Sequence, residues 1–279
     1  MNHFRLCAIG LAAWIGAQPV MAADQAAPPT MTAEQSAAVQ RAMTRGQMMQ
    51  VYDQAAWITT DDLLAKLPVP RRGEVGGWVV TPAVQGVHID YVGKDAHAGQ
   101  AVYSADVVDG KIAGSIVHPA DALPALGDLP LRMVRALTTA RAELARHDKW
   151  GMCANAMPNS IVLPPDATGT IAVYLMTPQV ETGKIPFGGH YEIDVAADGS
   201  VKSARAFTNS CLTMSPQKDA KGDTVGLFMT HLLDPQPTEI HVFEQIAAGM
   251  PVYVGTTSNE LVWEVRDGKI TLAGRIPKN

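Results

Sequence analysis

The segment 190–195, HYEIDV, is where side chains that could do chemistry lie closest together in this sequence. Alternate residues of a β-strand point to the same side, so His190, Glu192 and Asp194 would share one face and the residues between them would face the core. One histidine and two carboxylates in a row could hold a divalent metal ion or act as general acid and base. His190 and Glu192 are therefore candidate catalytic residues, and His190 is a candidate metal ligand.

A second interpretation of the same strand involves neither catalysis nor metal binding. If the Asp-Gly pair at 198–199 forms a hairpin turn, Glu192 lies opposite Arg205 and Asp194 lies opposite Ser203. This face would then be solvated and would carry one cross-strand ion pair, worth a few tenths of a kcal/mol. We favour this second interpretation.

Two further histidines, His231 and His241, fall on two strands that we predict to be adjacent, with Glu239 near the second histidine. Together with His190 they are candidate metal ligands, and together with His190 and Glu192 they are candidate catalytic residues. A zinc centre needs about three such ligands and a water molecule. However, the sequence contains no compact ligand spacing such as H-E-x-x-H and no cofactor motif. We therefore favour packed or hydrogen-bonded histidines and expect no cofactor.

The first 23 residues have the pattern of a secretory signal peptide. Arg5 precedes an apolar run over 6–15, and small residues follow, so cleavage is expected after Ala22 or Ala23. The apolar run is too short for a membrane-spanning helix, which needs roughly 20 residues. An uncleaved anchor or an internal helix is the alternative, but the small-residue end of the segment argues against both. We expect an exported protein without a transmembrane segment, located in the periplasm.

The chain has three cysteines, and Cys7 would leave with the signal peptide. In an oxidising compartment Cys153 and Cys211 would most simply form a disulfide. The closed loop of about 60 residues would stabilise the fold by roughly 4 kcal/mol in the chain-entropy model. A catalytic thiol or a metal ligand is the alternative. Neither cysteine has a C-x-x-C partner or a histidine nearby in sequence, so we predict the disulfide.

The pattern of apolar residues predicts an α+β fold, in which antiparallel hairpins are packed by an N-terminal helical segment and one central helix. Thr32 and Gln35 form a capping-box pattern before a helix over 33–57, and a short helix follows to residue 68. The central helix is expected over 129–148. Asp-Gly pairs at 109, 198 and 267 predict hairpin turns. The expected strands are 78–80, 87–92, 101–108, 111–118, 171–176, 189–196, 200–208, 227–233, 238–245, 251–255, 261–266 and 269–273.

These elements suggest four segments along the chain. Residues 1–23 are the signal peptide, 24–67 the N-terminal helical segment, 68–150 β-hairpins with a helix, and 151–279 mostly antiparallel strands. The last two segments are expected to form one continuous domain. About 256 mature residues are enough for one large domain or for two small ones.

The run VLPP…VYLMTPQ…PFGGHYEIDVAADG…FTNSC within 162–211, followed by THLLDPQPTEIHVF at 230–243, resembles a group of exported proteins of Gram-negative bacteria that have no assigned activity. The resemblance covers the C-terminal half of the chain. It implies an envelope setting and transfers no site residue.

The net charge of the chain limits the classes of partner that we expect. Loss of the signal peptide removes Arg5 and no acid, so the formal net charge changes from −5 to −6. An acidic chain without a basic cluster does not favour nucleic acid as a partner. The charge is compatible with an envelope protein or a small-molecule ligand as the partner.

Because the sequence contains no compact ligand spacing and no cofactor motif, we expect a non-catalytic periplasmic binding or envelope-associated protein. The alternatives are a periplasmic hydrolase, with or without a metal, and an inhibitor or immunity-type protein that caps a partner.

Overall fold

The structure is a computed structural model, and it describes residues 29–218 and 224–277. The predicted signal peptide lies outside the described residues. The helices are α1 (Ala33–Lys66), α2 (Asp128–Leu144) and α3 (Glu239–Ala248), with short 3-10 helices at Val69–Glu74 and Asp95–His97. The strands are β1 (Val75–Pro82), β2 (Val87–Gly93), β3 (Ala101–Val108), β4 (Lys111–Val117), β5 (Asn159–Val162), β6 (Ile171–Met176), β7 (Ile185–Pro186), β8 (His190–Val195), β9 (Val201–Ala206), β10 (Thr213–Met214), β11 (Gln217–Lys218), β12 (Thr224–His231), β13 (Val252–Thr256), β14 (Leu261–Arg266) and β15 (Lys269–Arg275).

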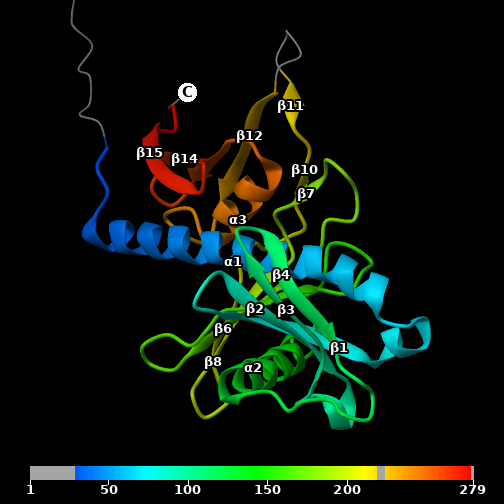
Figure 1. Cartoon of the computed structure of the whole chain (residues 1–279). Coiled ribbons are helices and arrows are strands. Elements are labelled where there is room, and N and C mark those ends of the chain that lie inside the picture. Colours follow the sequence, from blue (N-terminus) through cyan, green and yellow to red (C-terminus); the bar gives the residue numbers. More distant parts are fainter. Residues whose placement is uncertain (1–28, 219–223, 278–279) are drawn as a thin grey trace, which may run out of the picture.

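The strands form four sheets, and the fold class is α+β as predicted. Two sheets have four strands each, in the orders β1-β2-β3-β4 and β5-β6-β8-β9. The C-terminal sheet has the order β11-β12-β13-β14-β15, and β10 pairs with β7. Helix α1 crosses the molecule between the C-terminal sheet and the two four-stranded sheets (Figure 1).

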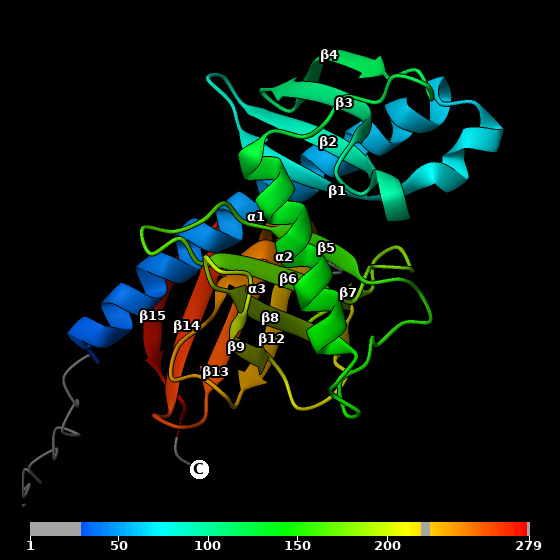
Figure 2. The same cartoon turned by 90° about the horizontal axis from the view of Figure 1, so that it is seen from below.

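The two four-stranded sheets lie between α1 and α2. Neighbouring residues point to opposite helices: Val79 of β1 and Val162 of β5 pack in the α2 cluster, whereas Val80 and Ile161 pack in the α1 cluster. Figure 2 shows α2 lying across β6 and β8. Because both faces of β6 are covered, its six residues are all buried and the strand reads as one continuous apolar run.

Helix α1 begins as predicted, but the predicted interruption near residue 58 is wrong. Thr32 Oγ1 accepts a hydrogen bond from the Gln35 amide at 3.1 Å, and Gln35 Oε1 accepts one from the Thr32 amide at 3.0 Å. Thr60, the expected start of the second helix, and its neighbour Thr59 instead donate their hydroxyls to backbone carbonyls four residues earlier. Threonine can remain inside a helix in this way. The Tyr91 hydroxyl, 3.0 and 2.7 Å from these two hydroxyls, holds them against β2.

The predicted strand 238–245 is wrong, because these residues form the start of α3. Thr238 is the N-cap, and the Nδ1 atom of His241 accepts a hydrogen bond from the Thr238 amide at 3.0 Å. The first seven residues of α3 are all buried. At the start of the helix, Ile240 and Val242 alternate with Glu239 and His241, and this two-residue period is typical of a strand. The chain passes through α3 between β12 and β13, and these two strands are consequently parallel. The strands are mostly antiparallel, as predicted, and β12 with β13 is a parallel pair among them.

The three Asp-Gly hairpins are confirmed. They join β3 to β4, β8 to β9 and β14 to β15. At the first and last of these turns both residues have positive φ, 49° and 69° for Asp109 and Gly110 and 51° and 70° for Asp267 and Gly268. Two positive φ angles are what a type I′ turn requires, and Asp-Gly suits it.

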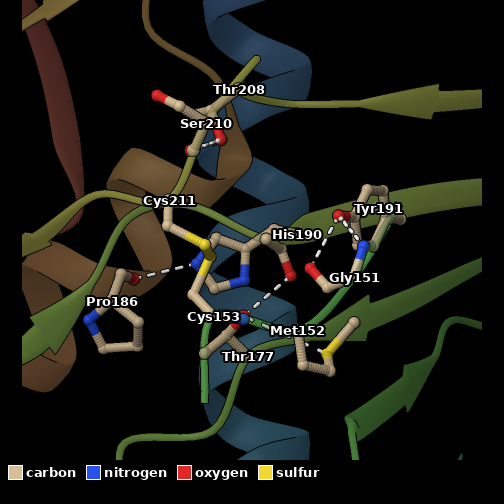
Figure 3. Close-up of a disulfide and its surroundings, with 11 residues drawn as sticks. Gly151, Met152, Cys153, Thr177, Pro186, His190, Tyr191, Thr208, Ser210 and Cys211 are labelled. Atoms are coloured by element: carbon tan, nitrogen blue, oxygen red, sulfur yellow. Dashed lines mark hydrogen bonds between the residues drawn. A yellow bond between two sulfur atoms is a disulfide. The ribbon is translucent and has the colours of Figure 1, made fainter. Parts of the chain in front are cut away.

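The structure joins Cys153 and Cys211 in a disulfide, as expected, with a Cα–Cα distance of 5.4 Å and a sequence separation of 58. Figure 3 shows the ring of His190 beside the two sulfur atoms, with its Nε2 directed to the carbonyl of Pro186. The bond ties the loop that follows α2 to the segment that follows β9. The disulfide thus fastens two segments that surround the start of β8.

The contact between α1 and α3 depends on a glycine. A Cβ atom added to Gly46 would lie 2.5 Å from the Cβ of Val242 and 2.8 Å from the carbonyl oxygen of Glu239. Glycine in a helix interior normally costs about 1 kcal/mol relative to alanine. Here that cost is offset by the close approach of two helices, which a side chain would prevent.

We therefore predict that Gly46→Ala destabilises the protein by about 1–3 kcal/mol, because the added methyl group overpacks the helix contact. At the exposed position Thr44, Thr44→Ala should instead raise stability by up to about 0.5 kcal/mol. Urea unfolding followed by circular dichroism measures both. A gain in stability for Gly46→Ala would show that α1 and α3 do not pack this closely.

Candidate functional site

Glu192 lies under α1 and α3 and not on a solvated face. Arg45 of α1 forms an ion pair with Glu192, and its Nη1 lies 3.5 Å from Oε1 of Glu239 at the start of α3. The Tyr174 hydroxyl of β6 donates to Glu239 at 2.7 Å and lies 3.2 Å from Glu192 Oε1. The predicted register, with Glu192 opposite Arg205, is confirmed. The prediction of a solvated face is wrong, because two helices cover it and Glu192 is buried.

Arg205 makes its ion pair with Asp234 instead of Glu192. Its Nη1 and Nη2 atoms lie 3.1 and 2.5 Å from the two carboxylate oxygens of Asp234. The same carboxylate lies 2.9 Å from Nε2 of His231. Burial alone would raise the pKa of Asp234, but the His231 hydrogen bond and Arg205 hold it down at about 2. Asp234 is therefore ionised at neutral pH and fixes the loop that leads into α3.

The histidines predicted as site residues lie in one buried region. The rings of His231 and His241 meet edge to face with their centroids 4.7 Å apart. Nε2 of His190 is 2.8 Å from the carbonyl oxygen of Pro186, and Nδ1 of His241 accepts from the Thr238 amide. Burial lowers the pKa of His190 to about 4 and also lowers the pKa of His241, so both rings are neutral at pH 7.

These contacts give the histidines structural partners. Within residues 29–218 and 224–277, no group of three or more His, Cys, Asp or Glu side chains is arranged to hold a metal ion. His190, His231 and His241 are all at most 2% exposed. The metal and catalytic interpretations of these histidines and Glu192 stay predictions without a geometry in their favour.

A groove lies elsewhere, along the C-terminal half of α1. It has a volume of about 860 Å³, and its walls are α1, the start of β1, one side chain of α2 and the loop before β5. Asp53, Trp57, Asp61 and Leu64 line it from α1. Their spacing of four, four and three residues places them on one helix face. The opposite face of this part of α1 carries buried residues such as Ala55 and packs into the core.

The lining of the groove is mainly apolar and partly exposed. The Trp57 side chain is 69% exposed and that of Met157 is 81% exposed. Trp78 of β1 is half-buried and lies with its ring centroid 6.0 Å from that of Tyr91. Exposed aromatic and apolar side chains around a concave surface are typical of a ligand site.

A few polar groups converge on the same groove. Asn159 donates to Asp53 at 2.5 Å, and burial raises the pKa of this carboxyl group. Arg72 donates to the carbonyl of Leu64 at 2.5 Å. Arg141 donates to the carbonyl of Gly76 at 3.4 Å. A mainly apolar lining with few polar groups is the usual composition of a small-molecule site.

Sequence reasoning did not identify this groove. Trp57 is the last residue of the helix predicted over 33–57, and Arg141 lies among the charged residues of the predicted central helix over 129–148. The signal that could have found the α1 wall is Trp57 between Asp53 and Asp61 at four-residue intervals, since a tryptophan among acids on one face does not belong to a core. The facing residues come from separate elements, and no local pattern connects them.

Within the described ranges, none of the helices combines the length and apolarity needed to cross a bilayer.

The carboxylates of Glu192 and Glu239 share one arginine, and this makes folding stability depend on pH. Burial, and then the charge of Glu239, raise the pKa of Glu192 to about 7 from an ordinary 4.5, against the opposing effect of Arg45. A raised pKa means that the folded protein holds the proton more tightly than the unfolded chain. The resulting stabilisation is complete below about pH 4.5 and is lost as the pH rises through about 7.

We predict that Glu192→Gln removes this pH dependence. Between about pH 5 and about pH 8, the free energy of unfolding of the wild type should fall by about 2–3 kcal/mol more than that of the variant. Urea unfolding at the two pH values measures it. Glu181→Gln, which alters an exposed ion pair with Lys184, should keep the wild-type profile. An unchanged pH profile for Glu192→Gln would contradict this assignment.

No family model, no curated protein and no solved structure matches this chain. The resemblance of 162–211 and 230–243 to exported proteins of Gram-negative bacteria therefore stays a prediction. The functional assignment rests on the geometry of the groove.

Proposed function

We propose that this protein is an exported, non-catalytic binding protein that takes a small ligand with an apolar body in the groove between α1 and β1. The observation that carries the proposal is a groove of about 860 Å³ with Trp57 exposed on its wall. Ligand sites commonly have volumes of about 300–1,000 Å³ and are lined by apolar and aromatic side chains. An exposed indole costs hydrophobic free energy that a bound apolar ligand recovers.

The signal-peptide pattern and the disulfide between Cys153 and Cys211 support a periplasmic location for this binding protein. The hydrolase alternative requires a nucleophile or a base at a cavity. Among the described residues, the groove lining holds Asp53, Asp61 and Thr60 but no histidine, cysteine or serine to pair with them. Asp53 accepts a hydrogen bond from Asn159, and the Thr60 hydroxyl donates to the carbonyl of Ala56. The histidines that suggested hydrolysis are buried in contacts of their own. The binding role therefore has the stronger support.

The test uses N-phenyl-1-naphthylamine, a neutral probe that fluoresces in apolar sites. The mature protein should bind it saturably. Trp57→Ala should weaken binding by about tenfold, because the ligand loses the face of one indole ring. Trp57 is 69% exposed, so its removal should leave the fold intact, which circular dichroism checks.

Phe228→Ala is the matched control, because Phe228 is a 58% exposed aromatic residue of β12 and does not line the groove. It should leave the affinity unchanged. Probe binding that is absent in the wild type, or that falls equally in both variants, would overturn the proposal.

A further inference from the structure

The guanidinium of Arg141 lies against the wall of the groove without a carboxylate partner. Its Nη2 and Nη1 atoms lie over β1, 3.5 and 3.8 Å from where a Cβ atom of Gly77 would be. The hydrogen bond that it makes, to the carbonyl of Gly76, is long at 3.4 Å. Among the described residues, no carboxylate lies within ion-pair distance of Arg141.

Arg141 is exposed on α2, and two part-buried arginines, Arg45 and Arg205, differ from it in having carboxylate partners. Arg45 is paired with Glu192, and Arg205 is paired with Asp234 through both terminal nitrogens. Burial lowers the pKa of both, but Tyr174 and then Glu192 and Glu239 raise the pKa of Arg45, and Asp234 raises that of Arg205, so both pKa values are raised. Burial lowers the pKa of Arg141, and no neighbouring carboxylate offsets it. Arg141 is thus a cation with unused hydrogen-bonding capacity beside an apolar surface.

The carboxylates of the groove do not form an ion pair with Arg141. Asp53 accepts its hydrogen bond from Asn159. Asp61 is exposed on α1, and it forms no ion pair with Arg141. Arg72, the other cation of the groove, directs its donors to the carbonyls of Leu64 and Leu67 at the end of α1.

We infer that the ligand is a small amphipathic carboxylate whose anionic group pairs with Arg141 while its apolar part lies on Trp57 and Trp78. This inference rests on the proposed function and adds the class of ligand. A guanidinium can form two parallel hydrogen bonds to a carboxylate, which provides both energy and orientation. The indoles, which line the same groove, would contact the rest of the ligand.

The test compares octanoate, 1-octanol and octylamine as competitors of N-phenyl-1-naphthylamine. Octanoate should bind about tenfold more tightly than octanol, because it adds a charge-assisted hydrogen-bond pair. Arg141→Gln should abolish this preference by weakening octanoate binding about tenfold. Arg135→Gln, at an exposed position of the same helix, should preserve the preference.

The outcomes separate this inference from the proposed function. Equal affinities for octanoate and octanol, tighter binding of octylamine, or an equal loss of octanol binding in Arg141→Gln would overturn the inference alone. If the probe itself binds saturably in the Trp57-dependent manner, the proposed function survives these results. If neither the probe nor any of the three compounds binds, both fall.

Discussion

The burial of Arg45 between Glu192 and Glu239 fixes the position of the long helix on which the rest of the structure depends. A buried charge without its partner costs about 3–5 kcal/mol, so these residues are held together once the core closes. Arg45 belongs to α1, Glu192 to β8 and Glu239 to α3, and the contact therefore joins three parts of the chain that are far apart in sequence. The Tyr174 hydroxyl completes the cluster from β6.

Because α1 is one continuous helix, a contact that fixes its N-terminal half also fixes the position of its C-terminal half. The 34 residues of α1 extend over about 50 Å. Its N-terminal half packs on α3 through Gly46, and its C-terminal half packs on β1, β2 and β3 through residues such as Leu63. The face that carries Trp57 is then held opposite β1 at a set distance. The groove is thus a product of the helix position, and its aromatic wall does not depend on a flexible loop.

Much of the fold could be predicted from local sequence, because the responsible interactions are local. The Thr32–Gln35 cap, the Asp-Gly turns and the register of Glu192 opposite Arg205 depend on a few neighbouring residues. The start of α3 was predicted as a strand because Ile240 and Val242 alternate with the polar residues Glu239 and His241. The solvated face of β8 was predicted wrongly because a strand pattern does not show which helices will cover it. The groove was missed because Trp57, Gly77 and Arg141 meet only through tertiary packing.

The central claim is that ligand binds between α1 and β1, and the indole N–H signals of the mature protein test it most directly. Four tryptophans remain after position 23: Trp57, Trp78, Trp150 and Trp263. In a titration with octanoate followed by ¹H–¹⁵N correlation spectra, the signals of Trp57 and Trp78 should shift together and saturate. Trp150, stacked between His147 and Tyr191, and the buried Trp263 should keep their positions. Shifts confined to Trp150 or Trp263, with Trp57 unchanged, would contradict the account.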